Sequence, residues 1–238
     1  MILDIDNASS VQSFVNKITA GWFDIDSMYH TLKSNSHTNR SNFWKITDYM
    51  IDVISNSLDC SPRDFLKIWE QKCLKHDAML MGYHCTRHSN ESVFTDKGIL
   101  PLSEKTIEIS SVQKNIAAKE TWGYRSTSGV GPYFFLSYKA AKNPDNHFYL
   151  SGPEILLAVD GHQPTNNPAE SIPLIIHCAI PFSIIPNKKF CTFCIVKAHL
   201  IFLDPDPEDD SENLFEGSSI DLHGCALDPQ HIVKIEKI

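Results

Sequence analysis

Hydrophobic residues recur at helical spacing along the first eighty residues of the chain. The pattern i, i+3, i+4 predicts a helix with one buried face. A second such stripe runs through residues 44–58, and a third helix is predicted from residue 62 because Ser61 offers an N-cap and Pro62 suits the first helical position. The first stripe consists of Val11, Phe14, Val15, Ile18 and Trp22.

The pattern changes near residue 80. Short runs rich in β-branched and aromatic residues alternate there with turn residues, which is typical of strands. A short helical stretch, 91–98, ends at Gly98. We therefore predict an α+β fold, with a helical subdomain over residues 1–79 and a mainly antiparallel sheet domain over residues 80–238. The predicted strands are 80–86, 133–137, 173–180, 190–203 and 231–238.

Composition narrows the class of protein. The 238 residues carry a formal net charge of −8 and are 42% hydrophobic, which is ordinary for a globular protein. No apolar run approaches the ~18 residues of a membrane span, so no membrane partner is expected. The acidic N-terminal residues do not resemble a signal peptide, and the seven scattered cysteines do not form the dense pairs of a secreted knot. A cytoplasmic location is therefore the expectation.

Several familiar site motifs are missing or incomplete. Cys191 and Cys194 form a Cys-x-x-Cys pair without a second ligand pair at suitable spacing, so burial is favoured over zinc and no metal site is expected. His84 and Cys85 are neighbours on a predicted strand, where adjacent side chains point to opposite faces and cannot form a nucleophile–base pair. The sequence has neither a P-loop nor a Gly-x-Gly-x-x-Gly unit between a strand and a helix.

Two segments, which follow each other along the chain, stand out from this background. The first presents a histidine on a strand, followed by a short helix and a glycine. The second begins with a glycine turn, continues into an aromatic strand, and ends in a helix of small residues. They read Gly82-Tyr-His84-Cys85-Thr86-Arg with Gly98-Ile-Leu-Pro101, and Gly129-Val-Gly131-Pro-Tyr133-Phe-Phe-Leu-Ser137-Tyr138-Lys-Ala-Ala141.

In these segments the sequence resembles the ADP-ribosyltransferase superfamily, in its diphtheria-toxin and poly(ADP-ribose)-polymerase-like branch with a His-Tyr-Glu signature. The resemblance implies a split antiparallel β-sheet and NAD as the substrate. It implies that His84 contacts a ribose hydroxyl, with Cys85 and Thr86 beside it. It further implies that Tyr133 stacks on the nicotinamide and that Tyr138 walls the nicotinamide pocket. An imidazole can hydrogen-bond a hydroxyl, and an aromatic face can stack on a ring.

The sequence departs from this family at two places. Cys85 stands where the family usually has glycine, and no glutamate occupies the family's position in the tail Leu222-His223-Gly-Cys-Ala-Leu-Asp228-Pro229-Gln230. Cleavage of the nicotinamide–ribose bond passes through an oxocarbenium-like cation that a carboxylate stabilises. The candidates for this carboxylate, in order of preference, are Glu154, Glu216 and Glu170.

The resemblance implies transfer of ADP-ribose from NAD to a macromolecular acceptor with release of nicotinamide. Small intracellular relatives act as toxins or antiphage effectors, which implies a toxin role and a neutralising antitoxin as a partner. The acceptor stays open between protein and nucleic acid. The acidic net charge favours protein, whereas the four lysines and one arginine around the second segment suit either a nucleic-acid acceptor or the NAD diphosphate alone. The alternatives are an NAD glycohydrolase, an inactive NAD- or ADP-ribose-binding module, and a structural interaction protein.

Overall fold

The chain divides into two compact units. The computed structural model describes residues 1–35, 51–88, 90–101, 131–143, 172–203, 215 and 218–238. The first unit, here called the helical unit, comprises Met1–Met79, Pro181–Ser183 and Asn187–Ser211. The second, the sheet unit, comprises Leu80–Ile180, Ile184–Pro186 and Glu212–Ile238. The sheet unit begins at Leu80, and residues 181–183 and 187–211, which lie within the predicted 80–238 domain, belong to the helical unit.

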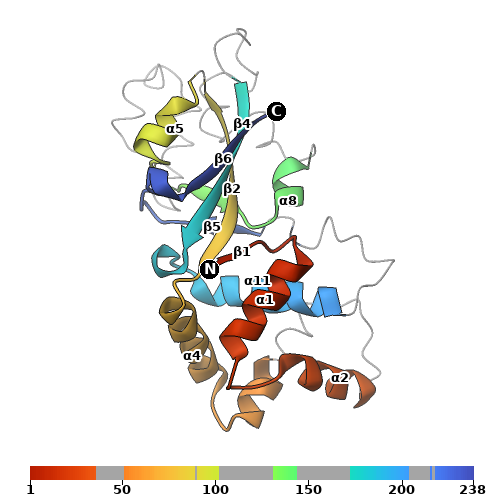
Figure 1. Ribbon diagram of the computed structural model, residues 1–238. Helices are drawn as coiled ribbons and strands as arrows, with labels where there is room; N and C mark the ends of the chain where they lie inside the picture. The colour runs from red at the N-terminus through yellow and green to blue at the C-terminus, as the bar shows by residue number, and fades with distance from the viewer. Residues whose placement is uncertain (36–50, 89, 102–130, 144–171, 204–214, 216–217) are drawn as a thin grey trace, which may run out of the picture. The chain divides into compact units, whose positions relative to one another are not determined.

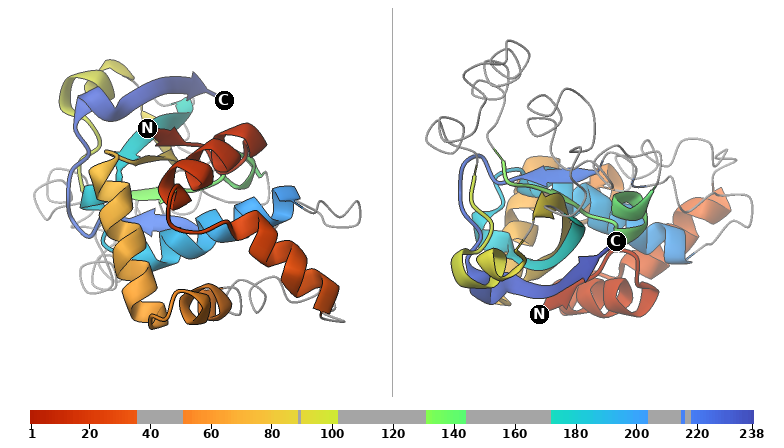
Figure 2. Two further views of the ribbon diagram at one scale, coloured as in Figure 1. Left: turned by 60° about the horizontal axis from the view of Figure 1, so that its bottom comes forward. Right: turned by 90° about the horizontal axis from the view of Figure 1, so that it is seen from above.

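The helical unit is built on helices from both ends of its discontinuous sequence. Helix α11 packs against α1 and α4, which also contact each other (Figure 2). Residues 51–57 are helical as well. The elements are β1 (Ile2–Leu3), α1 (Ala8–Thr19), α2 (Ile25–Asn35), α4 (Pro62–Lys75) and α11 (Lys188–Leu203), the last preceded by the 3-10 helix η3 (Phe182–Ile184).

The predicted cap and buried face of the third helix are those of α4, whereas α1 is capped by Asn7 and ends at Thr19, before Trp22 of the predicted stripe. The Ser61 hydroxyl accepts a hydrogen bond from the backbone N–H of Asp64 at 3.1 Å, and Pro62 occupies the first turn of α4. One face of α1 and one face of α4 are buried, as the periodicity predicts. The buried residues of α1 are Val11, Phe14, Val15, Ile18 and Thr19, and those of α4 are Phe65, Trp69 and Cys73.

The prediction of a strand at residues 190–203 was wrong. Ten of the sixteen residues of α11 are buried, on every side of the helix. A helix that is apolar all round shows no 3.6-residue periodicity, so its pattern resembles that of a buried strand. The side-chain carbonyl group of Asn187 caps its start by accepting a hydrogen bond from the Phe190 N–H at 3.2 Å.

A buried polar link joins three helices of the helical unit. The Nε2 atom of His199, only 1% exposed, lies 2.6 Å from Asp26 Oδ1. The other carboxylate oxygen accepts a hydrogen bond from Gln12 Nε2 at 3.2 Å. Because these residues come from α11, α2 and α1, the link fixes the helices relative to one another.

The sheet unit contains a sheet with the strand order β5-β3-β2-β4-β6 (Figure 1). The pairs β2–β3, β3–β5 and β4–β6 are antiparallel. Its elements are β2 (Met79–His88), α5 (Ser92–Lys97), β3 (Tyr133–Phe135), α8 (Tyr138–Lys142), β4 (Ile172–Pro181), β5 (Ser219–Asp221), the 3-10 helix η4 (Pro229–His231) and β6 (Ile232–Lys237).

These elements confirm the α+β class and four of the five predicted strands. The predicted helix at 91–98 is also present as α5, and it ends at Gly98, whose φ of 74° is in the left-handed region. Among the helices that the structure describes, none is both long enough and apolar enough to cross a membrane.

Candidate functional site

Strand β2 places His84 and its neighbours on opposite faces of the sheet. The His84 ring contacts the Phe134 ring on β3, with centroids 5.5 Å apart. Tyr83 pairs with Phe135 across the same two strands and packs with Cys85 on the other face. Because side chains alternate along a strand, β2 presents His84 to one environment and Tyr83 to another.

His84 is held in a defined tautomer. Its Nδ1 atom lies 2.8 Å from the backbone oxygen of Tyr133. A carbonyl oxygen only accepts, so Nδ1 carries the proton. Burial lowers the pKa of His84 below the ordinary value of 6.5, and the bond to Tyr133 opposes this in part. The neutral ring therefore offers Nε2 as a hydrogen-bond acceptor, and no described residue occupies that atom.

The structure brings the backbone of Tyr133, and not its ring, to His84. Phe134 shares the His84 face, so alternation places the ring of Tyr133 on the opposite face. Cross-strand pairing sets Tyr133 directly opposite Asp221 on β5. The turn before β3 is tied to the segment after β5, because Gly131 O accepts from the Gly224 N–H at 2.8 Å. Asp221 therefore shares the face of the Tyr133 ring and not that of His84.

Cys85 and Thr86, both predicted beside the NAD site, lie on different faces of β2. Cys85 is buried on the Tyr83 face, and its thiol donates to the backbone oxygen of Ala141 at 3.6 Å. Burial raises the pKa of Cys85 to about 12, so the side chain stays a thiol. Thr86 is buried and shares the face of His84.

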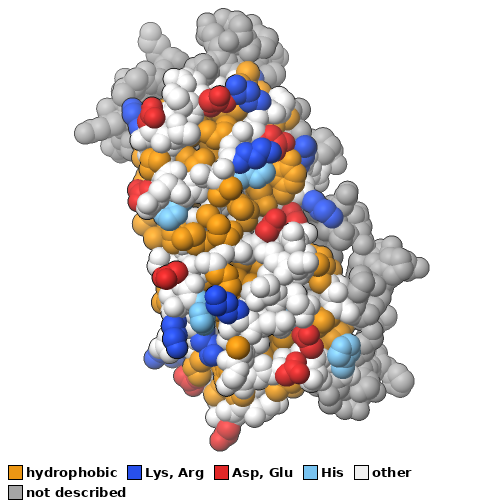
Figure 3. All heavy atoms as spheres, in the orientation of Figure 1, with side chains coloured by type: hydrophobic (Ala, Val, Ile, Leu, Met, Phe, Trp, Pro, Cys, Tyr) orange, Lys and Arg blue, Asp and Glu red, His pale blue; other side chains and the backbone are white. Residues whose placement is uncertain are grey.

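On the Tyr83 face, four side chains converge on the carboxylate of Glu236 in β6. The Tyr138 hydroxyl donates to Oε1 at 2.8 Å, and Lys142 Nζ lies 3.4 Å from the same oxygen. Lys234 Nζ and His177 Nε2 lie 3.1 Å and 3.2 Å from Oε2. We call these five residues the Glu236 network. In the space-filling view, lysine, acidic and histidine side chains gather over β4 and β6 (Figure 3).

The Tyr138 and His177 rings of the Glu236 network pack against each other and against the ring of Tyr83. The ring centroids of Tyr83, Tyr138 and His177 lie 5.2 to 5.4 Å from one another. Tyr138, predicted to wall a nicotinamide pocket, therefore packs its ring in this cluster and binds Glu236 through its hydroxyl. Since α8 starts three residues after β3, the network fixes the end of the strand that contains Tyr133.

Partial burial and hydrogen bonding act in opposite directions on the Glu236 carboxyl. Desolvation raises its pKa, but the hydrogen bonds from Tyr138, Lys234, His177 and Lys142 outweigh this effect and lower the pKa from 4.5 to about 2. The carboxylate is thus more stable in the folded chain than in the unfolded one. Its contribution to stability is complete above pH 4.5 and is lost as the pH falls from 4.5 toward 2.

Replacing Glu236 by glutamine is expected to lower the free energy of unfolding by about 1–2 kcal/mol near neutral pH, because the charge-assisted hydrogen bonds weaken. Urea unfolding near pH 7 and near pH 3 measures this effect, and the difference between wild type and variant should shrink at the lower pH. The matched control is Glu91→Gln, which removes the exposed ion pair with Lys237 and should change little. A constant difference at both pH values would contradict the assigned pKa direction.

The three glutamates proposed for catalysis lie outside the described residues, because the structure describes neither 144–171 nor 216–217. The sequence reasoning did not select Glu236 or His177. Alternation in β6 places Lys234 and Glu236 on one face, which was visible in the sequence. Their proximity to His177 depends on the β4–β6 register, where Ile175 pairs with Glu236 and His177 with Lys234, and no local pattern reveals that register.

The cysteines are free thiols. Cys191 and Cys194 are buried in α11, and burial raises the pKa of Cys191. Within the part of the chain that the structure describes, no three His, Cys, Asp or Glu side chains are grouped so as to hold a metal ion.

Comparison of the chain with protein-family models, with curated proteins and with solved structures yields no match.

Proposed function

We propose that this chain is an NAD-dependent mono-ADP-ribosyltransferase, which transfers ADP-ribose to a macromolecular acceptor and releases nicotinamide. The observation that carries the proposal is the 2.8 Å bond between His84 Nδ1 and the Tyr133 backbone oxygen. It joins the two segments that resemble the transferase superfamily, although 49 residues separate them. The cytoplasm, with its cysteines reduced, is the proposed location, and a toxin or effector role is the proposed context.

In this proposal His84 orients the substrate. The bond to Tyr133 fixes the proton on Nδ1, so Nε2 accepts a hydrogen bond from a ribose hydroxyl of NAD. Because burial lowers the pKa of His84 below 6.5, the neutral, accepting form of the ring predominates at and above that pH. The enzyme needs no prior proton transfer to expose this acceptor.

The reaction breaks the bond between the nicotinamide nitrogen and C1′ of the ribose, and the electron pair leaves with nicotinamide. A carboxylate stabilises the oxocarbenium-like cation. The acceptor then forms the bond to C1′ and loses a proton. The candidates for the carboxylate are Glu154, Glu216 and Glu170. Nicotinamide release after Glu154→Gln, Glu216→Gln and Glu170→Gln, tested in turn, identifies it.

Two substitutions of His84 test its role, because each preserves a different ring nitrogen. His84→Asn keeps an amide N–H near the position of Nδ1 but removes the acceptor at Nε2, whereas His84→Gln places an amide near Nε2. We expect His84→Asn to lower kcat/KM for NAD by about ten-fold or more, and His84→Gln to lower it less. Nicotinamide release measures both, with His30→Asn on the exposed face of α2 as the control.

The same assay with labelled NAD and cell lysate separates the rival activities. Label on a macromolecule supports the transferase, and its sensitivity to nuclease or protease identifies the acceptor. Free ADP-ribose alone indicates a glycohydrolase, and NAD binding without nicotinamide release indicates an inactive module. Unchanged turnover in a folded His84→Asn protein would overturn the proposed site.

A further inference from the structure

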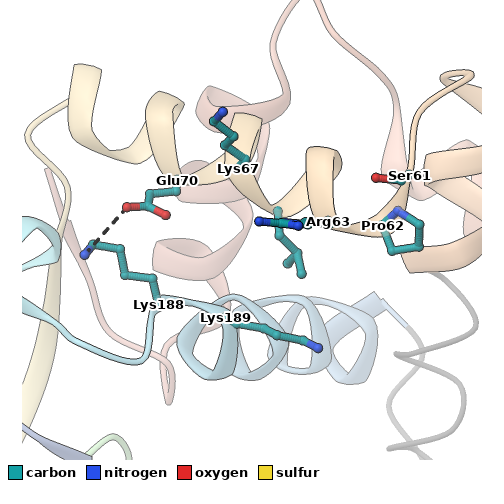
Figure 4. Close-up of a pocket in the computed structure, with 8 residues that line it drawn as sticks. Ser61, Pro62, Arg63, Lys67, Glu70, Lys188 and Lys189 are labelled. Atoms are coloured by element: carbon teal, nitrogen blue, oxygen red, sulfur yellow. Dashed lines mark ion pairs between the residues drawn. The ribbon is translucent and has the colours of Figure 1, made fainter.

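A basic groove lies within the helical unit. It has a volume of about 730 Å³ and is formed by α4 and the start of α11 (Figure 4). Arg63 and Lys67 line it from α4, and Lys188 and Lys189 line it from α11. Its size is in the range of ligand-binding pockets.

The charges of the groove are unbalanced. Four cationic side chains face one acidic lining residue, Glu70, which pairs with Lys188 at 3.6 Å. Arg63, Lys67 and Lys189 form no ion pair with any described residue. Four positive charges and one negative charge leave an excess of three positive charges, in a chain whose net charge is −8. The excess is therefore local to the groove.

These cations stand where helix electrostatics disfavours them. Lys188 and Lys189 occupy the first turn of α11, which contains no acidic residue, although the positive end of the helix dipole repels cations there. Arg63 and Lys67 are spaced i, i+4 on α4, where like charges repel. Packing of the helices does not require this arrangement, since Arg63, Lys67 and Lys189 are exposed. A bound anion would relieve both repulsions.

The lining indicates what kind of anion fits. The cations come from two helices and most are exposed, whereas a small phosphate ligand is typically held by a few converging, buried donors. Among the described residues, no aromatic ring lines the groove, so they offer no platform on which a base could stack. Lysine and arginine without base-stacking partners are typical of contacts to the phosphate backbone, which are independent of sequence.

We propose that this groove binds the phosphodiester backbone of a nucleic acid. The first-turn N–H groups of Lys188 and Lys189 add donors for phosphate oxygens. Binding is electrostatic, weakens with salt and does not discriminate between base sequences. It does not depend on the proposed transferase activity, since a nucleic acid can bind here whether or not NAD is cleaved.

Fluorescence anisotropy tests the proposal with the full chain and labelled single-stranded DNA, duplex DNA and single-stranded RNA of mixed sequence. The triple variant Arg63→Gln/Lys67→Gln/Lys189→Gln leaves the Lys188–Glu70 pair intact. We expect its affinity to fall about ten-fold or more, and the slope of log K against log salt to decrease by about 2–3. The control Lys17→Gln/Lys75→Gln/Lys97→Gln removes the same charge from exposed helix positions and should retain wild-type binding.

A second variant acts in the opposite direction. Glu70→Gln removes the negative charge of the groove and should raise the affinity several-fold, a gain that a damaged fold would not produce. Failure of wild type to bind any of the three polynucleotides at low salt would overturn the proposal. Equal losses of affinity in the two triple variants would also overturn it, as would binding to polyglutamate as tight as binding to nucleic acid. Binding of pyrophosphate or ATP without binding of any polynucleotide would overturn it as well. Nicotinamide release, measured in parallel, shows separately whether the proposed transferase function holds.

Discussion

Replacing Gly98 by alanine is expected to lower the free energy of unfolding by about 3 kcal/mol or more. Gly98 has φ 74° and ψ −159°, a backbone region that is essentially restricted to glycine. A Cβ atom at this position would also overlap the backbone oxygen of Leu227. That oxygen accepts the Ile99 N–H at 2.9 Å, and Ile99 O accepts the Leu227 N–H at 2.9 Å. The substitution would therefore break both backbone hydrogen bonds between Ile99 and Leu227 and would also strain the backbone at residue 98.

Urea unfolding followed by circular dichroism measures this loss. Gly21→Ala is the matched control, because Gly21 has a similar φ of 67° but no described atom lies within 4 Å of the position that a Cβ atom would take there. The control substitution should lower the free energy of unfolding by only about 1 kcal/mol, the cost of placing alanine in the left-handed backbone region. Equal losses for the two substitutions would show that the contact with Leu227 contributes nothing.

Replacing Phe134 by alanine is expected to lower the free energy of unfolding by about 3–5 kcal/mol, the range typical of removing a large aromatic side chain from a core. Phe134 is completely buried, pairs with Ile220 on β5 and contacts the His84 ring. Gly82 leaves room for it, because a Cβ on Gly82 would lie 3.1 Å from Phe134 Cβ.

Phe134→Leu separates the stability of the sheet unit from the position of His84. Leucine keeps most of the buried volume, so it should lower the free energy of unfolding by less than about half of the loss that alanine causes. It does not restore the ring contact with His84, so under the proposed function KM for NAD should still rise. Unfolding energies and nicotinamide kinetics on the same preparations test both parts. Equal destabilisation by leucine and alanine would contradict the packing argument.

The helices whose one face is buried could be predicted from the sequence, and the uniformly buried helix could not. α1 and α4 alternate apolar and polar residues at helical spacing, and Ser61 marks where α4 begins. In α11 even Lys197 and His199 are buried, so the helix has no exposed polar face. Its sequence pattern therefore resembles that of a buried strand. Its length of sixteen residues was the one indication against a strand, because strands rarely exceed about ten residues.

The candidate site shows the same division between local and distant information. His84 was selected from its own segment, and the structure joins that segment to Tyr133. The alternation that separates the rings of His84 and Tyr133 follows from the β2–β3 register, which neither segment encodes by itself. Glu236 was missed for a similar reason, since its partners Tyr138 and His177 lie 98 and 59 residues earlier in the chain.

The interlaced course of the chain has a consequence for its synthesis. Helices α1 and α4 leave the ribosome first, but α11, which packs against both, is made more than a hundred residues later. Until residue 203 has been translated, the apolar faces of α1 and α4 lack their partner. The helical unit therefore cannot complete its core as an N-terminal domain during translation, unlike domains that fold in order as they emerge. Its nascent form exposes the apolar faces of α1 and α4 until α11 has been made, and exposed apolar surface of this kind is prone to aggregation.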